Sequence, residues 1–336
     1  MHNKKDLCSV VTEIHIKKAG EKMKKILMRE TGSVDVLYEV EASIPEIADH
    51  ELLIKMAATS VNHFDLVIRK GEYFSTIPKE MQPTFPHLLG LDLSGVVEKV
   101  GKDVKGFNVG DHVIGLNRTG TYAEYVVANP VDITKITEKA NLEKIAGFPV
   151  ITGTAWSATV KNGQIKAGER VLVHGGAGGV GQMAIQFAKK AGAVVYTTAS
   201  EKNREYLLNL GADVVIDYLT TDFTDVVRDI DLVIDTVGGK TLDNSYQVLK
   251  RGGRLISVSM PPNVEKAAQY EISASFVRGE LPSDVIQEIV EDYTNGKIKL
   301  NIANTFNFDV EDVKRAHLSF DDRAISGKLL IVMGAK

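Results

Sequence analysis

The residues with the clearest capacity for chemistry form a glycine-rich run, Val171-Leu-Val-His-Gly-Gly-Ala-Gly-Gly-Val-Gly. Within it, Gly176, Gly178 and Gly181 keep the spacing G-x-G-x-x-G between a strand-like run and a helix-like stretch. Glycines at these positions permit a tight turn and a close approach of the backbone, and free N–H groups at the start of the following helix can bind a pyrophosphate. The alternative is a loop that serves packing alone. We assign five residues to a dinucleotide: Gly176, Gly178, Gly179, Val180 and Gly181.

The end of the second predicted strand indicates which dinucleotide this is. A free ribose 2′-hydroxyl is usually held by an Asp or Glu about 20 residues beyond the glycines, but here the strand ends Thr197-Thr198-Ala199-Ser200. An acid would repel a 2′-phosphate, whereas Arg204 can pair with one, so the sequence favours NADPH over NADH. Glu201 keeps the other reading open, because a shift of one residue would place it on the ribose.

The stretch around the glycine run has the pattern of a parallel α/β sheet. After Pro149, short β-branched runs alternate with helix-length amphipathic stretches. From Val180 to Ala191, apolar residues recur at i, i+3, i+4, i+7, i+8 and i+11, which is one buried face of a helix. The pattern predicts a doubly wound sheet of six strands: Val171–His174, Val194–Thr198, Val214–Ile216, Leu232–Asp235, Arg254–Val258 and Ile272–Val277.

The two ends of the chain have a different texture. Between Lys25 and about Phe148, short apolar runs broken by Gly, Pro and Asp predict many short strands, and hence a small β domain. Beyond Pro282 we expect a helix to about Asn295, a helix near Val310–Leu318 and a final strand Lys328–Val332 that returns to this domain. The expected division is an N-terminal extension of residues 1–22, a β domain of residues 23–150 and 281–336, and a dinucleotide-binding domain of residues 151–280.

The composition narrows the classes of function. The 336 residues carry 40 Lys+Arg against 44 Asp+Glu, a net charge of −4, so there is no basic excess for binding nucleic acid. No apolar run reaches the roughly 18–20 residues of a membrane span. The one cysteine, Cys8, cannot close an intrachain disulfide, and the N-terminus lacks the apolar core of a signal peptide. We therefore expect a cytoplasmic protein with a small-molecule partner, without nucleic acid or membrane.

Several motifs together are typical of one family. They are Asn62-His-Phe-Asp65, Arg69-Lys-Gly71-Glu-Tyr73, Gly90-Leu-Asp92-Leu-Ser-Gly95, Val109-Gly-Asp-His-Val113, Tyr122-Ala-Glu-Tyr125, the glycine run, Leu210-Gly-Ala-Asp213 with Asp217-Tyr218, and Asp235-Thr-Val237-Gly238-Gly239. With them the chain resembles the zinc-independent, quinone oxidoreductase-like branch of the medium-chain dehydrogenase/reductases. The resemblance implies an α/β protein in which a GroES-like β domain is combined with a Rossmann doubly wound parallel sheet, and an active site between them.

The resemblance also implies contacts with NADPH. Ser200, Arg204 and Tyr218 match positions that hold the 2′-phosphate, although Tyr218 is also consistent with a tyrosine that only ends a strand. Thr154, Val237 and Val258 match positions beside the nicotinamide. Asn62 matches a residue near the nicotinamide ribose.

Metal ligands are missing from the matching positions. Zinc-dependent members of the family have a Cys where Asn62 stands and Gly-His-Glu where this chain has Gly90-Leu91-Asp92. Without a Lewis acid, oxidation of an alcohol loses its usual stabilisation of the alkoxide. Reduction of an electron-poor acceptor remains feasible, so we expect no metal.

The expected reaction is hydride transfer from NADPH to a quinone or to an α,β-unsaturated carbonyl. Hydrogen-bond donors would stabilise the negative charge on the acceptor oxygen. We assign catalytic roles to Asn62 and to Tyr73, whose phenol matches a proton donor of related enoyl reductases; a pocket-wall role of Tyr73, with water as the proton source, is the alternative. Two other functions stay open, namely an enoyl-thioester reductase and a non-catalytic NADPH-binding or sensor protein.

The last strand of the predicted sheet suggests an assembly. Ile272–Val277 ends the sheet, and an exposed strand edge that carries Phe276 and Val277 is usually paired or covered. In the resembling family two such edges pair across a twofold axis. We therefore expect a homodimer.

Overall fold

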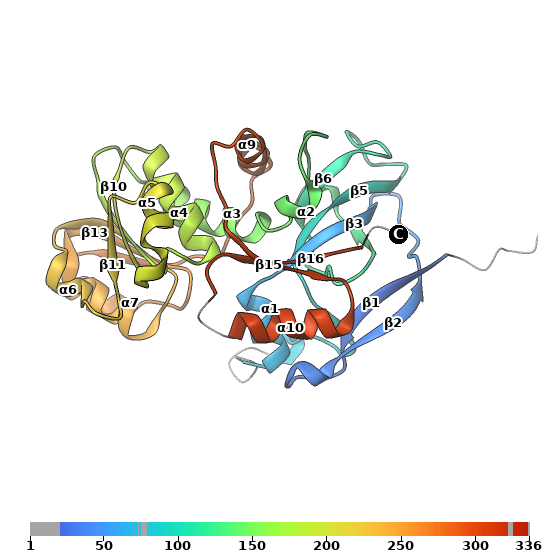
Figure 1. Ribbon diagram of the computed structural model, residues 1–336, viewed down its shortest axis with the longest axis horizontal. Coiled ribbons are helices and arrows are strands. Elements are labelled where there is room, and N and C mark those ends of the chain that lie inside the picture. Colours follow the sequence, from blue (N-terminus) through green and yellow to red (C-terminus); the bar gives the residue numbers. More distant parts are fainter. Residues whose placement is uncertain (1–20, 73, 75–78, 322–324, 335–336) are drawn as a thin grey trace, which may run out of the picture.

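The computed structural model describes residues 21–334, except residues 73, 75–78 and 322–324. Two groups of strands lie at opposite ends of the molecule (Figure 1). One is built from the middle of the sequence, and the other contains both its early part and its last strand. Helix α3 (Pro149–Trp156) lies between them.

The middle of the sequence forms a six-stranded parallel sheet, in the order β11-β10-β9-β12-β13-β14. All six predicted strands are confirmed within a few residues at their ends. Because the chain proceeds outward in both directions from the neighbouring strands β9 and β12, the carboxyl edge of this pair is the topological switch point where such sheets bind ligands. The strands are β9 (Arg170–His174), β10 (Val194–Ala199), β11 (Val214–Asp217), β12 (Ile230–Asp235), β13 (Leu249–Ser257) and β14 (Ser273–Phe276).

Helices connect these strands, and the first of them has the predicted buried face. In α4 (Gly179–Lys190), Met183, Ala184 and Ala188 are completely buried in the core against Val171 and Val195. This apolar face is what fixes α4 on the sheet. The other helices are α5 (Arg204–Asn209), α6 (Phe223–Val226), α7 (Gly239–Ser245) and α8 (Val264–Gln269), with short 3-10 turns at Glu201–Asn203 and Tyr246–Val248.

The two ends of the chain meet in a second, seven-stranded sheet. Its order is β15-β16-β3-β5-β6-β8, and β7 also pairs with β3. The final strand β16 runs antiparallel to β3, with Leu330 opposite Ser60, so the predicted return of the tail is confirmed. The strands are β3 (Leu52–Val61), β5 (Asp92–Val100), β6 (His112–Leu116), β7 (Tyr125–Ala128), β8 (Ile133–Lys135), β15 (Ile302–Asn307) and β16 (Lys328–Val332).

A small three-stranded sheet, β2-β1-β4, accompanies it. Its strands are β1 (Lys22–Met28), β2 (Leu37–Ser43) and β4 (His87–Leu88). Strand β1 begins at Lys22, which pairs with Ser43, one residue before the expected start of the β domain. Residues 1–20 of that extension lie outside the described part of the chain.

Helices close this end of the molecule and join it to the other. They are α1 (His63–Lys70), α2 (Leu142–Ile145), α9 (Ser283–Thr294) and α10 (Val310–Asp321), with 3-10 turns at Val34–Val36, Lys79–Met81 and Pro130–Asp132. Helix α3 continues as a π-helical turn, Ser157–Lys161. It crosses the expected boundary at residue 150, and Ile151 belongs to one buried cluster with Ile114 of β6 and Val173 of β9. Within the described residues, no helix has the length and apolar composition of a membrane span.

Candidate active site

The glycine turn after β9 has room for a ligand at one position and none at two others. A Cβ on Gly176 would lie 2.0 Å from the Thr197 hydroxyl oxygen, and a Cβ on Gly181 would lie 2.3 Å from the Gly175 carbonyl oxygen. These two glycines are therefore required by packing. A Cβ on Gly178 would meet only the Gly175 carbonyl oxygen, at 3.4 Å. Packing does not explain the glycine at position 178, whereas a close approach of a ligand does.

The start of α4 is open in the way that an anion requires. Gly178 is its N-cap residue, and no side chain caps the helix. The first N–H groups of a helix carry partial positive charge and lack partners within it. Gly179 and Val180 begin this helix, so the five residues assigned to a pyrophosphate form one turn at the carboxyl edge of β9.

Two of the residues assigned to the 2′-phosphate follow neighbouring strands. Ala199 of β10 pairs with Asp217 of β11, so Ser200 and Tyr218 leave the sheet side by side, and the side chain of Tyr218 is exposed. Arg204 lies four residues after Ser200; it donates from Nε to Glu201 at 2.7 Å and from Nη1 to the Val215 carbonyl at 2.9 Å. Ser200 and Tyr218 thus follow neighbouring strands. Arg204 pairs with Glu201, the acid that kept NADH as an alternative cofactor.

The C-terminal segment also reaches this cluster. The Ser326 hydroxyl donates to Asn203 Oδ1 at 2.7 Å, and Asn203 Nδ2 donates to Ser200 Oγ at 3.0 Å. One residue further, the Gly327 amide donates to the Ala177 carbonyl of the glycine turn at 3.0 Å. The segment before β16 therefore supports two parts of the expected cofactor site, which the sequence analysis did not predict.

The residues assigned to the nicotinamide lie on three elements. Val237 follows β12 and Val258 follows β13 at the same edge of the sheet, where Asp235 pairs with Ser257. Asp235 accepts the Val237 amide at 3.1 Å, which fixes the turn, and about half of the Val237 side chain is exposed. Thr154 lies on α3, one turn after Ile151, and Ile151 contacts the start of α4. The Thr154 hydroxyl donates to the Val150 carbonyl at 2.7 Å.

Asn62 is part of a buried, charged cluster formed by Asn62, Asp92 and Lys328. Asn62 Nδ2 donates to Asp92 Oδ2 at 2.8 Å, and Lys328 Nζ donates to Asn62 Oδ1 at 2.7 Å. The Lys328 ammonium lies 3.4 Å from Asp92 Oδ2. Asp92 also accepts from the Ser60 hydroxyl and from the Val150 amide at the start of α3. Burial lowers the pKa of Lys328, while the nearby Asp92 and Asp65 carboxylates raise it.

A second acid, Asp65, lies next to this cluster. Its carboxylate accepts the backbone N–H groups of Asn62, at 2.8 Å, and of Gly90, at 3.0 Å, so it joins the start of α1 to the turn before β5. Burial raises the pKa of Asp65 to about 7, against the opposing effect of these two N–H groups. A carboxyl group with this pKa exchanges its proton near neutral pH.

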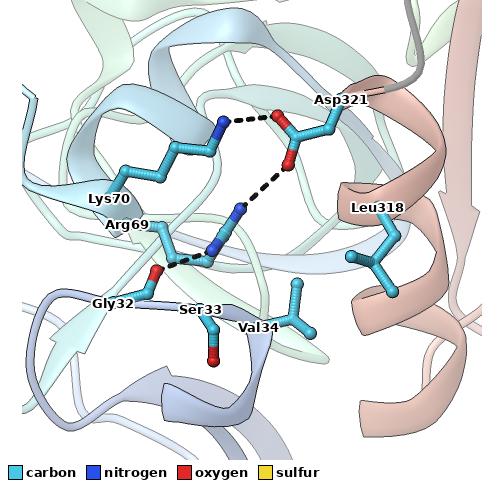
Figure 2. A pocket seen from close by; sticks show the side chains of 7 residues that line it. All are labelled: Gly32, Ser33, Val34, Arg69, Lys70, Leu318 and Asp321. Carbon is cyan, nitrogen blue, oxygen red and sulfur yellow. Dashed lines mark hydrogen bonds and ion pairs between the residues drawn. The ribbon is translucent and has the colours of Figure 1, made fainter.

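The other predicted catalytic residue, Tyr73, lies outside the described residues. The helix that precedes it is described. A pocket of about 400 Å³ lies beside the C-terminal end of α1. Lys70 and Arg69 both pair there with Asp321 of α10 (Figure 2). Arg69 Nη1 also donates to the Gly32 carbonyl at 2.7 Å. This ion-pair cluster anchors the end of α1, and none of the residues assigned to the cofactor lines the cavity.

The sequence analysis missed Lys328. The sequence feature that could have indicated it is a lysine at the first position of the otherwise apolar strand Lys328–Val332. A lysine at the end of a strand is ordinarily exposed to solvent, so its burial was not expected. Its partners are 266 and 236 residues away in the chain, so no local pattern links them. Asp92 was noted only as a replacement for a metal ligand.

The residues present do not fit a zinc ion. Asn62 offers an amide instead of a thiolate, and its oxygen already accepts from Lys328. The second position of the Gly90-Leu91-Asp92 run is apolar. The Asp92 carboxylate already faces a positive charge, the buried Lys328 ammonium at 3.4 Å.

Comparisons with known proteins agree with this arrangement. Residues 48–138 match the family model of the alcohol dehydrogenase GroES-like domain, and residues 179–280 match that of the zinc-binding dehydrogenases. The chain is 31% identical to a probable quinone oxidoreductase of Schizosaccharomyces pombe over 91% of this chain and 96% of the relative. It is 29% identical to an NADPH-dependent alkenal/one oxidoreductase of Arabidopsis thaliana, over 93% and 80%.

Solved structures show the same likeness. A quinone oxidoreductase of Coxiella burnetii superposes with a TM-score of 0.87 at 33% identity, over 94% of this chain and all of the other. The Escherichia coli quinone oxidoreductase in complex with NADPH gives 0.82 at 26% identity, over 92% and 100%. The chain belongs to the medium-chain dehydrogenase/reductase superfamily and combines its GroES-like domain with its Rossmann-like sheet. It is an oxidoreductase that uses a nicotinamide cofactor.

Proposed function

We propose that this protein transfers hydride from NADPH to a quinone or to an α,β-unsaturated carbonyl, without a metal ion. One observation carries the proposal: the uncapped N-terminus of α4 lies against Lys328 of the Asn62–Asp92–Lys328 cluster. The residues of this cluster do not suit a metal ion. The names of the Schizosaccharomyces pombe and Arabidopsis thaliana relatives support the same two acceptor classes.

The bound cofactor would supply hydride from its reduced nicotinamide. A quinone takes up this hydride and one proton to give the hydroquinone; an enone takes the hydride at its β-carbon and a proton at its α-carbon. In both reactions negative charge develops on the acceptor oxygen, which a hydrogen-bond donor stabilises. We assign this donor role to Tyr73 and the orientation of the nicotinamide ribose to Asn62.

We further propose that the cofactor is NADPH and that Arg204 recognises its 2′-phosphate together with Ser200 and Tyr218. Arg204 forms an ion pair with Glu201. A 2′-phosphate, with more charge than a carboxylate, would replace Glu201 on the guanidinium. Titration calorimetry with NADPH and NADH tests this, and equal dissociation constants for the two would overturn it.

The substrate class is tested by steady-state assays with NADPH and a panel of quinones, alkenals, alkenones and enoyl thioesters. We expect turnover of quinones or enones that persists after dialysis against a chelator. Turnover of enoyl thioesters alone would assign the protein to the enoyl-thioester reductases. Tight NADPH binding without any turnover would favour a binding or sensor protein.

For the wider setting we propose a cytoplasmic homodimer. The dimer is supported by β14, which ends the parallel sheet as an edge strand with Phe276 partly exposed. The cytoplasm is supported by the single cysteine of the chain. The dimer is tested by light scattering at micromolar concentration, where the mass of one chain would contradict it. Association that survives Phe276→Asp would place the interface elsewhere.

A further inference from the structure

The Lys328 ammonium is fully engaged inside the protein. Its three N–H donors face three acceptors: Asn62 Oδ1 at 2.7 Å, the Val61 carbonyl at 3.2 Å and Asp92 Oδ2 at 3.4 Å. The side chain is 4% exposed, and that of Asp92 is completely buried. A buried charge pair of this kind is costly to desolvate, and a pair of apolar side chains would often serve stability as well. Stability alone therefore does not explain the lysine.

The position of Lys328 fixes the orientation of the Asn62 carboxamide. Lysine can only donate, so the Asn62 oxygen must face it; the Asp92 carboxylate can only accept, so the Asn62 NH₂ group must face that side. Rotation of the amide by 180° would set N–H against N–H and oxygen against oxygen. One N–H group of Asn62 donates to Asp92 at 2.8 Å, and among the described residues no acceptor is found for the second.

The stem of the same lysine supports the glycine turn. A Cβ on Gly179, the first residue of α4, would lie 3.0 Å from Lys328 Cδ. The neighbouring residue Gly327 forms a β-bridge with Gly178, and its amide donates to the Ala177 carbonyl. One side chain therefore contacts the expected pyrophosphate turn with its methylene groups and the Asn62 amide with its charge.

We propose that Lys328 is a positioning residue for the nicotinamide half of NADPH. Its ammonium holds the Asn62 amide in the single orientation that presents the second N–H to the nicotinamide ribose. The inference rests on the proposed function, because it takes the ligand to be NADPH. It adds a residue and a role that neither the family resemblance nor the motifs assign.

The test compares two ligands that share the adenosine 2′-phosphate. NADPH has the nicotinamide ribose, and 2′,5′-ADP lacks it. Lys328→Met keeps the stem on Gly179 and removes the ammonium, so we expect the dissociation constant of NADPH to rise about tenfold, the worth of one hydrogen bond, and that of 2′,5′-ADP to stay within about twofold. Calorimetry measures both, and Trp156 on α3, the only tryptophan of the chain, gives a second signal through energy transfer to the reduced nicotinamide.

A double-mutant cycle asks whether Lys328 acts through Asn62. If it does, Lys328→Met should add less than about twofold to the effect of Asn62→Ala on NADPH binding, whereas independent effects would multiply to about a hundredfold. Lys102→Met is the matched control, because this lysine is exposed in the same domain and pairs with Asp49. It should leave both dissociation constants unchanged.

Loss of the buried charge could also unfold Lys328→Met. The double variant Lys328→Met/Asp92→Asn removes both charges of the buried ion pair and provides a second protein for the same two titrations. Equal weakening of NADPH and 2′,5′-ADP in either folded variant, or full multiplication in the cycle, would overturn the positioning role. Lys328→Met could weaken NADPH but not 2′,5′-ADP, as expected, while the wild-type protein turns over no quinone or enone. That result would refute the proposed function and leave the role of Lys328 intact.

Discussion

The two domains differ in whether they bury positively charged side chains. Among the described residues, Arg69 and Lys328 are the only buried lysine or arginine side chains, and both belong to the GroES-like domain. Lys328 pairs with Asp92 and Arg69 with Asp321. In the Rossmann domain the completely buried Asp235 instead accepts from neutral donors, the amides of Val237 and Gly238 and the Ser257 hydroxyl.

We relate this difference to what each domain would offer the proposed cofactor. The Rossmann domain presents backbone: a glycine turn, an open helix end and strand ends, whose neutral N–H groups are oriented by the fold itself. The GroES-like domain presents side chains, which need neighbours to hold them in one orientation. Paired buried charges hold a neighbouring side chain in one orientation, because an ammonium can only donate hydrogen bonds and a carboxylate can only accept them.

The largest effect is expected from the same substitution in the two domains. Asp92→Asn leaves the Lys328 ammonium without its counter-charge and turns an NH₂ group toward donors, so the free energy of unfolding should fall by about 3–5 kcal/mol. In Asp235→Asn the new NH₂ group can donate to the Ser257 hydroxyl, and the loss should be about 1 kcal/mol. Urea unfolding measures both. Equal losses would show that the buried cation makes no difference.

In the proposed complex with NADPH, the Rossmann domain uses a charged side chain, Arg204, to recognise the 2′-phosphate. Arg204→Ala should weaken NADPH binding roughly tenfold or more and leave NADH unchanged, because only NADPH presents an anion to the guanidinium. Glu201→Gln is the matched variant: it frees Arg204 from its ion pair and should tighten NADPH slightly. Loss of affinity for both dinucleotides in Arg204→Ala would mean that the arginine supports the loop through its bond to Val215.

The same difference decides how much could be predicted from the sequence. The six parallel strands, the buried face of α4 and the glycine turn each have a pattern within a short stretch of sequence, and all were predicted. The contribution of Lys328 was not, because its contact with Asn62 forms only when the last strand pairs with β3. The Arg204–Glu201 pair was also missed, since a shift of one residue on a short turn decides which side chain faces the arginine.

Tyr73 tests whether the GroES-like domain contributes a group to the chemistry itself. If its phenol donates to the acceptor oxygen, Tyr73→Phe should lower enone turnover about tenfold or more and quinone turnover less, because the enolate must be protonated at carbon. The NADPH dissociation constant should not change. Unchanged enone turnover, with a deuteride isotope effect showing that hydride transfer limits the rate, would leave water as the proton source.

The smallest effect is a difference in pH dependence, for which each domain has one buried histidine. His174 lies between Thr198 and Ser245, and His317 lies between Arg69 and Tyr122. Burial lowers the pKa of both to about 3, and the charge of Arg69 acts in the same direction on His317. Both are neutral in the folded protein and take up a proton on unfolding below pH about 6.5, their ordinary pKa.

Asp65 has the opposite effect in part of the same range. Its pKa of about 7 lies above the ordinary value of 3.8, so the folded protein takes up this proton first, and the resulting stability is lost as the pH rises through 7. Between pH 4 and 6 the two histidines therefore reduce stability on acidification, while Asp65 opposes them. Each of these three groups should contribute about one proton to the slope of the unfolding free energy against pH in this range.

Each histidine variant should remove its own share of this slope. His317→Gln and His174→Gln should each lower the dependence of the unfolding free energy on pH by about 1.4 kcal/mol per pH unit between pH 4 and 6, the value for one proton. Urea unfolding at three pH values measures the slope separately from any overall loss of stability. Equal slopes in the two variants would show that burial alone keeps both rings neutral. A slope that changes only in His317→Gln would show that the neighbouring buried cation is required, and that the charges of the GroES-like domain also govern its response to acid.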